Sequence, residues 1–406
     1  MQVNIIKGRM FMKKLNTRNL FLIAFTLFSM FFGAGNLIFP PFLGYEAGLN
    51  AVPAFLGFAV TAVAFPILGV AATAKAGGVD ALCEKIHPKF SIIFSVAVYL
   101  CIGPMLAIPR TAGTSYSMFS FITRYIPDGN ILGIDSQLFS RIIFSLIFFT
   151  AAGWIAKSPE KLRDLLGKIM SPILLTLIVI MFGAALMHIG LPIYEPAELY
   201  KNGAFAEGFL QGYQTMDTMA ALVFGIVIAM NLKDMGINDG DDIAKETIRS
   251  GIIAGILILI IYGMITFCGV ISGSLIEGAS NGTDILTSLC FEFFGPAGAV
   301  LLAAIFFIAC FNVCIGLICS CAEFFAMKFT FLSFDKWRII LTVWSFIISI
   351  AGLDTIISIS VPVLSIIYPV AMVIIFMNLV PIAIFRKPAV QRIAVALSLL
   401  CGIISL

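Results

Sequence analysis

Long apolar segments separated by short polar stretches follow one another along the whole chain. A helix that crosses a bilayer needs about 20 mostly apolar residues, and eleven segments fit such helices. We therefore predict spans at 18–46, 51–75, 90–120, 137–156, 169–190, 204–231, 246–273, 296–326, 337–352, 357–380 and 389–406.

Composition supports this interpretation and excludes other classes of protein. Of the 406 residues, 60% are hydrophobic and 12% charged, whereas soluble domains have about 45–50% apolar and 25% charged residues. The apolar residues must therefore face lipid, and the chain is predicted to be an all-α polytopic membrane protein. Nine cysteines, mostly within apolar runs, and two histidines indicate neither a disulfide framework nor a metal centre. The scattered basic residues do not favour nucleic-acid binding.

The basic residues predict the orientation of these spans. Of the 25 lysines and arginines, 21 lie on the side of the N-terminal segment 1–17, three lie on the other side, and Arg110 lies within a span. Because cytoplasmic loops collect Lys and Arg, we expect a cytoplasmic N-terminus. Met12 is the more natural start, which makes residues 1–11 an upstream extension. The chain stops inside an apolar run, on the outside by this count.

The first span contains the residues Gly33-Ala34-Gly35-Asn36, followed by Pro40 and Pro41. Glycine is a poor helix former, so these residues predict an unwound segment in mid-membrane. The freed carbonyls could bind a cation, and the freed amides of the second half-helix could hold a carboxylate. The alternative is close helix packing through small residues.

The sixth span holds a dense polar cluster in an otherwise apolar segment. Its residues are Gln211, Tyr213, Gln214, Thr215, Asp217 and Thr218. A carboxylate in mid-membrane is costly unless paired or hydrated, so Asp217 is a candidate partner for a substrate amine, a coupling cation or freed amides. The alternative is a helix end near the interface. Two interruptions five spans apart indicate an inverted repeat with the binding site between its halves.

Three further spans carry polar or helix-breaking residues. In the eighth span, Asn312, Gly316, Cys319, Ser320 and Glu323 share one helix face, which suits either a sodium site or a packing seam of small residues. In the third span, Pro104 predicts a kink, and Arg110 is either a gate paired with an outside acid or a snorkelling side chain. In the tenth span, Ser358, Ser360, Pro362 and Ser365 predict another broken or kinked helix.

Five strings in order resemble one family: FFGAGNLIFPPFLG, IPRTA, GYQTMDTMAALVFG, CSCAEFF and ISVPVLSIIYP. They are similar to the bacterial branched-chain amino acid:cation symporters (system II carrier proteins) of the amino acid–polyamine–cation superfamily, and the resemblance covers residues 12–406. It implies a leucine-transporter-like fold with a first repeat at 18–190, an inverted second repeat at 204–380 and an additional helix at 389–406. The family is expected to have twelve spans, which implies truncation after the eleventh.

The resemblance also implies roles for individual residues. Gly33, Ala34 and Gly35 would meet the substrate carboxylate, and Asn36 would give a side-chain oxygen to a cation. A second cation site would use carbonyls around Ser29 and Phe32 with Cys319 and Ser320. The predicted substrate-binding set is Phe32, Gly33, Ala34, Gly35, Tyr213, Thr215 and Asp217.

The function that we predict is sodium-coupled import of leucine, isoleucine and valine by alternating access in the bacterial cytoplasmic membrane. A proton-coupled transporter of another small neutral amino acid is the alternative. A channel would need a continuous polar path, and a membrane enzyme would need Asp217 beside a histidine, yet His87 and His188 fall near span ends. No P-loop motif occurs, which argues against an ATP-driven pump. No enzyme activity, cofactor or obligate protein partner is predicted.

Overall fold

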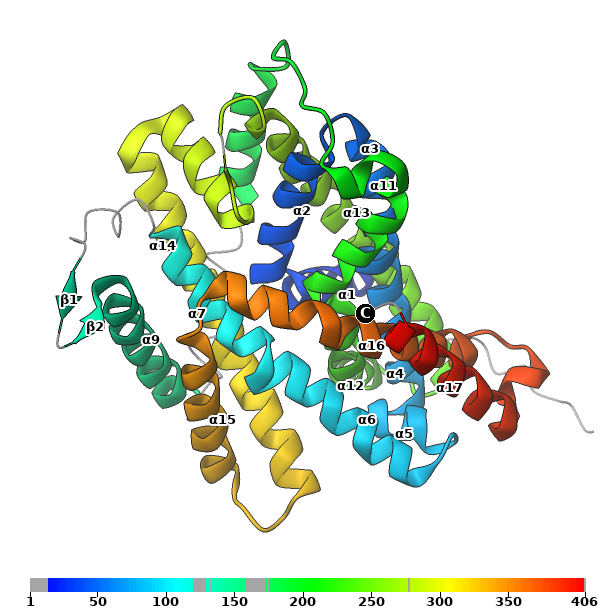
Figure 1. Cartoon of the computed structure of the whole chain (residues 1–406). Helices are drawn as coiled ribbons and strands as arrows, with labels where there is room; N and C mark the ends of the chain where they lie inside the picture. Colours follow the sequence, from blue (N-terminus) through cyan, green and yellow to red (C-terminus); the bar gives the residue numbers. More distant parts are fainter. Residues whose placement is uncertain are drawn as a thin grey trace, which may run out of the picture.

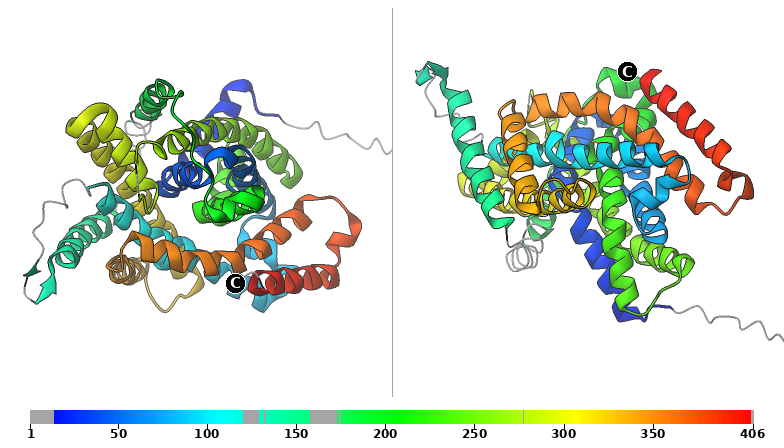
Figure 2. Two further views of the ribbon diagram at one scale, coloured as in Figure 1. Left: turned by 45° about the horizontal axis from the view of Figure 1, so that its top comes forward. Right: turned by 90° about the horizontal axis from the view of Figure 1, so that it is seen from below.

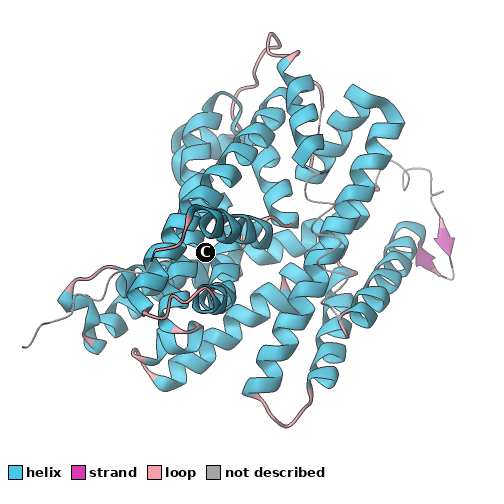
Figure 3. Ribbon diagram, turned by 180° about the vertical axis from the view of Figure 1, so that it is seen from behind, coloured by secondary structure: helices cyan, strands magenta, loops and turns pink. Residues whose placement is uncertain are grey.

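The computed structural model describes residues 14–119, 129–131, 133–157, 173, 175–276 and 278–404, and these residues are almost entirely helical (Figure 1). A short antiparallel pair, β1 (Asn130–Ile131) and β2 (Ile134–Asp135), lies at one edge of the helical body (Figure 3). The α-helices, with their bounds, are α1 (Thr17–Phe31), α2 (Ala34–Ala47), α3 (Ala51–Ala59), α4 (Phe65–Ala76), α5 (Val79–Glu84), α6 (Pro88–Leu100), α7 (Ala107–Met118), α9 (Ser136–Ile155), α11 (Glu198–Gln211), α12 (Asp217–Asp234), α13 (Gly240–Ser272), α14 (Gly282–Lys328), α15 (Phe334–Ser349), α16 (Leu353–Leu379) and α17 (Pro388–Ile404).

Six helical segments among the described residues are long and apolar enough to cross a membrane, and the bent pair α11–α12 makes a seventh. Three shorter apolar helices, Thr17–Phe31, Leu175–Leu186 and Pro388–Ile404, fall on further predicted spans. The chain is therefore an all-α multi-span protein. The predicted count of eleven stays a prediction, because several spans are divided into segments that are too short to cross a bilayer alone.

Two groups of helices pack around the interrupted segments (Figures 1 and 2). In the first group, α2 packs against α13, α12 against α4, and α11 against α3. In the second group, α7 packs against α14, α14 against α15, and α15 against α9. Contacts of α2 with α14 join the groups, so the break between α1 and α2 lies where the groups meet.

The irregular helices follow from local residue chemistry. The predicted kink at Pro104 is present: a π-helical segment, Cys101–Met105, separates α6 from α7, and Gly103 has non-helical dihedrals (φ −97°, ψ −125°). The predicted break in the tenth span is absent, because α16 continues through Pro362 and Pro369. The eighth span begins at Pro296 as predicted, because the chain reverses at Gly295 (φ +68°), directly before this proline; a separate helical segment of α14, capped by Asn281, precedes it.

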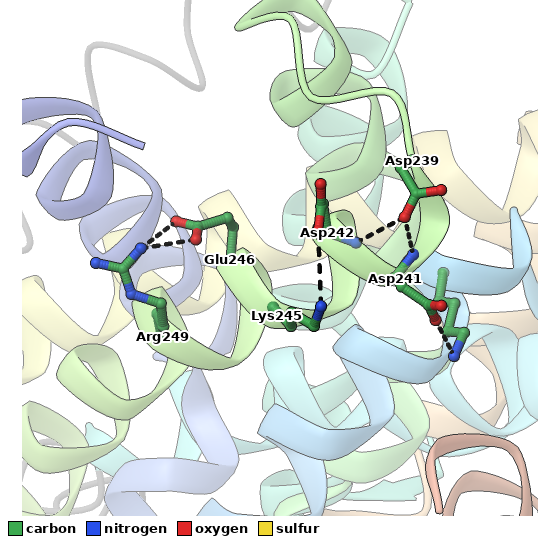
Figure 4. Close-up of polar contacts among 7 residues, drawn as sticks. Asp239, Asp241, Asp242, Lys245, Glu246 and Arg249 are labelled. Atoms are coloured by element: carbon green, nitrogen blue, oxygen red, sulfur yellow. Dashed lines mark hydrogen bonds and ion pairs between the residues drawn. The ribbon is translucent and has the colours of Figure 1, made fainter. Parts of the chain in front are cut away.

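The start of α1 is tied to α13 by a buried carboxylate. Glu246 accepts a hydrogen bond from the backbone N–H of Leu15 (3.2 Å) and two from Arg249 (2.6 and 2.8 Å). Figure 4 shows Glu246 with Arg249, beside the Asp239 cap that begins α13. This contact fixes the first half-helix to a long, continuous neighbour.

Candidate functional site

The first span is interrupted at Phe32 and Gly33, where both residues are extended (φ −74°, ψ 90° and φ −127°, ψ −169°). The unwound part begins one residue before the predicted segment, and Ala34, Gly35 and Asn36 form the first turn of α2. Asn36 explains the difference, because its Oδ1 accepts the Gly33 N–H (3.4 Å) and its own N–H donates to the Gly33 carbonyl (3.2 Å). Such contacts start a helix.

The sixth span is interrupted in a different way. A 3-10 segment, Gly212–Thr215, follows α11, and Met216 takes a left-handed conformation (φ 64°) before α12 begins, with a bend of 46°. Among the described residues, Met216 alone has a positive φ without being glycine, which is a strained backbone. Thr61 secures both halves: it donates to the Phe209 carbonyl (2.8 Å), and its carbonyl accepts from Thr218 (3.2 Å).

The two interruptions meet through a buried carboxylate. Asp217, the first residue of α12, is 4% exposed. Its Oδ2 accepts from Asn36 Nδ2 (2.8 Å) and from the hydroxyl of Tyr262 on α13 (3.1 Å). The Asn36 amide also donates to the Tyr262 hydroxyl. Sequence reasoning missed Tyr262, since a lone tyrosine in an apolar helix gives no signal of its partners.

A buried guanidinium lies on the other side of the same gap. Arg110, on α7, is 4% exposed and donates to the carbonyls of Gln214 (2.6 Å) and Thr215 (3.4 Å). Its Cζ lies 5.3 Å from the centre of the Phe39 ring. A Cβ added to Gly35 would lie 2.7 Å from Arg110 Nη2. Arg110 therefore lies buried between the two breaks and does not snorkel to the interface; no described ion pair joins it to an outside acid, and its role as a gate stays a prediction.

A cavity of about 260 Å³ opens next to Arg110. Phe39 and Gln214 line it, and both also contact Arg110. Gln214 is 5% exposed, and its Oε1 is one of the buried oxygens without a hydrogen-bond partner in the described part of the chain. Residues of α2, α11, α16, the start of α14 and the 3-10 segment Gly212–Thr215 line the cavity. They include Ile38, Phe42, Glu207, Leu210, Gln211, Asn281, Ile357 and Val361.

Three residues of the predicted substrate-binding set, Phe32, Tyr213 and Thr215, do not share one cluster. Phe32 stacks on Phe28 with ring centres 5.2 Å apart, within the core around α1 and α13. Tyr213 stacks on Tyr368 of α16 at 4.4 Å, within a second core. Thr215 is buried, and its hydroxyl donates to the Gly212 carbonyl (2.9 Å). Only Thr215 of these three shares a contact with Arg110.

The predicted cation-binding residues on the eighth span lie further along α14 than the turn that faces the break between α1 and α2, and the cation site stays a prediction. A Cβ added to Gly33 would lie 3.6 Å from Val313, which marks the part of α14 that faces the break. Cys319 instead donates to the carbonyl of Ala156, at the end of α9 (3.4 Å). Ser320 is seven residues beyond Val313, or about 10 Å along a helix.

Two other residues bear on the predicted cation site. Ser29, the expected carbonyl donor on α1, is exposed. Asn312, next to Val313, has a buried Oδ1 without a partner among the described residues. The spacing rule that placed five polar residues on one face of the eighth span gave no information on which turn of that face meets the first span.

Comparison with known proteins identifies the family of this chain. A family model described as branched-chain amino acid transport protein matches residues 16–406. The chain belongs to this family of transport proteins, which are not enzymes. It is 38% identical to the branched-chain amino acid permease BraB of Bacillus subtilis over 369 residues (90% of this chain, 81% of the relative). It is also 38% identical to the permease BrnQ of Escherichia coli over 357 residues (88% and 79%).

Two solved structures show that the chain has a leucine-transporter-like fold. One is Mhp1, a nucleobase-cation-symport-1 family transporter in a closed conformation with bromovinylhydantoin bound (TM-score 0.62, 14% identity, 96% of this chain and 94% of that chain). The other is MhsT in complex with L-phenylalanine (TM-score 0.55, 17% identity, 96% and 99%). The family is thus one of multi-span bacterial membrane carriers.

Proposed function

We propose that the chain is a secondary active importer of leucine, isoleucine and valine, coupled to sodium by alternating access. The observation that carries this proposal is the pair of helix interruptions, which face each other with Asp217 and Arg110 buried between them. Broken helices at mid-membrane are typical of the binding sites of secondary transporters. The relatives' names supply the substrate class.

In this proposal, residues 18–190 and 204–380 are the two inverted repeats, 389–406 is an additional helix and the N-terminus is cytoplasmic. The substrate lies between the N-terminal turn of α2 and the segment Gly212–Thr215. The amides of Gly33, Ala34 and Gly35 meet its carboxylate, because a helix N-terminus attracts anions. Phe32 and Tyr213 contribute apolar surface from either side.

Asp217 is the residue that we propose to attract positive charge, either the substrate ammonium or sodium as the second cargo. Its two hydrogen-bond partners, Asn36 and Tyr262, are neutral, and Arg110 acts on it only at a distance, without an ion pair among those described. Sodium binding would favour one state of the transporter and so raise its affinity for substrate. The predicted ligands Ser29, Cys319 and Ser320 are not part of this set.

Uptake of labelled leucine into proteoliposomes tests the proposal. Separate sodium and proton gradients are imposed on the same vesicles, with protein-free vesicles as the control. We expect saturable uptake that follows the sodium gradient and exchanges with internal leucine. Uptake that follows only the proton gradient would show that protons and not sodium are the coupling ion. Unsaturable flux without counterflow would indicate a channel.

A further inference from the structure

Arg110 carries a buried positive charge that forms no direct ion pair in the described part of the chain. The guanidinium contacts two carbonyls and an aromatic face. No ion pair in the described part of the chain includes Arg110. A charge placed within a membrane protein without an opposite partner is costly. Asp217 interacts with Arg110 only at a distance, so the guanidinium has no anion in direct contact among the described residues.

The surroundings of Arg110 show where that anion would bind. A guanidinium has five N–H donors, and the Gln214 and Thr215 carbonyls accept from Nη1 and Nη2. Nη2 also approaches Gly35 so closely that a Cβ there would lie 2.7 Å away. Gly35 belongs to the first turn of α2, whose free amides also attract negative charge. Two independent sources of positive potential thus converge on one point.

The cavity lies beside this point. Phe39, under the guanidinium, and Gln214, which accepts from it, both line the cavity. The side-chain Oε1 of Gln214 has no partner, so the wall beside Arg110 holds an unused polar group. The cavity therefore borders two residues that contact the guanidinium directly.

We propose that Arg110 recognises the carboxylate of the transported amino acid and makes the site selective for zwitterions over amides, alcohols and amines of the same side chain. The inference rests on the proposed function and deepens it. Arginine suits the role because its planar fork matches both oxygens of a carboxylate. Asp217, with neutral hydrogen-bond partners only, lies on the opposite side of the gap and suits the positive end of the same ligand.

Two other roles for Arg110 make different predictions. A gate that swings in and out changes the rate of uptake and leaves the equilibrium preference for leucine over leucinamide unchanged. If Arg110 only connects α7 to the sixth span, its substitution lowers the affinity for all ligands and the stability of the protein together. A carboxylate-recognising residue changes the ratio of the two affinities, because leucinamide has the same side chain and amine and lacks the anion.

Equilibrium binding of leucine and leucinamide to the purified full chain in lipid nanodiscs tests the inference. The variants are Arg110→Gln and Arg110→Lys, and thermal unfolding of each is recorded. Arg141→Gln is the matched control, because Arg141 also lies over an aromatic ring (Tyr116, 5.9 Å) and donates to a carbonyl (Ile350, 3.3 Å), away from the breaks. Arg110→Gln should weaken leucine binding about 10- to 100-fold and leave leucinamide nearly unchanged.

Arg110→Lys should keep a reduced preference for leucine, since lysine keeps the charge without the fork, and Arg141→Gln should behave as the wild type. An unchanged leucine-to-leucinamide ratio in Arg110→Gln would overturn the inference, as would equal loss of both ligands. If Arg110→Gln does not fold, Arg110→Lys decides. A reduced but remaining preference for leucine over leucinamide supports the inference, and loss of that preference without loss of folding overturns it. A wild type that binds no leucine would refute the proposed function instead.

Discussion

At the scale of single residues, the site depends on the absent side chain of Gly35 and on the hydrogen bonds that the Asp217 carboxylate accepts. Gly35 makes room for a guanidinium against the backbone of α2. Asp217 accepts hydrogen bonds from the Asn36 amide of the first span and from the Tyr262 hydroxyl of α13. Each of these residues contacts a different part of the chain, so each can be altered separately.

Gly35→Ala should lower leucine affinity at least 10-fold. The new Cβ would lie 2.7 Å from Arg110 Nη2 and 3.0 Å from the Thr215 carbonyl, so the guanidinium or the sixth span has to shift. Gly316→Ala on α14 is the control, because nothing lies within 4 Å of a Cβ there, and an alanine in a helix is tolerated or stabilising. Leucine binding that is equal in the two variants would contradict the close approach at Gly35.

Asp217→Asn should reduce leucine uptake at least 10-fold in proteoliposomes. The substitution keeps the shape and removes the charge, and it brings a donor toward the Asn36 amide, which is itself a donor. Glu198→Gln is the control, since Glu198 forms an exposed ion pair with Lys201 at the start of α11, and such pairs contribute little. Normal uptake by Asp217→Asn would make this carboxylate structural.

At the scale of elements, the half-helix α1 is held at its start by α13. Glu246 is buried and accepts from Leu15 and Arg249 (Figure 4). Two extended residues separate α1 from α2, so no continuous helix connects them. The contact with Glu246 therefore attaches α1 to α13 instead. We expect the contact to limit any movement of α1 relative to α13.

Glu246→Gln should lower the free energy of unfolding by about 1–3 kcal/mol, the range for hydrogen bonds to a charged group. Arg249 would lose its ion pair, and a Gln side chain offers one acceptor where the carboxylate offers two. Lys245→Gln is the control one residue away, because its pair with Asp242 is long (3.7 Å) and exposed. Thermal or denaturant unfolding in detergent measures both, and equal stability would show that the contact is weak.

At the scale of the whole molecule, binding of two cargoes to one site requires reciprocal coupling. If sodium raises leucine affinity by some factor, leucine must raise sodium affinity by the same factor. We expect equilibrium binding of each, measured at several concentrations of the other, to give equal factors. Each should also raise the unfolding temperature, since a ligand at 100 times its Kd stabilises by about 2.7 kcal/mol. Leucine affinity that is indifferent to sodium would refute this coupling.

The sequence by itself determined the membrane character, the kink at Pro104 and the two interrupted spans. These follow from local physical chemistry: apolar length sets a span, and glycine and proline weaken a helix wherever they stand. A mid-span acid such as Asp217 is informative for the same reason, because its cost in lipid does not depend on its neighbours in the fold. Local rules did not predict the helical segment of α14 that precedes the eighth span, where Asn281 caps a separate helix before the reversal at Gly295.

Only the tertiary structure decided which residues meet. Tyr262 reaches Asp217 from 45 positions away, and Arg110 reaches Gln214 from 104 positions away. Cys319 shares a helix face with Asn312, yet it contacts the end of α9, because the angle at which α14 crosses α2 decides which turn of that face meets the first span. Spacing along a helix fixes a face, whereas the depth at which that face meets its partner depends on the packing of whole helices.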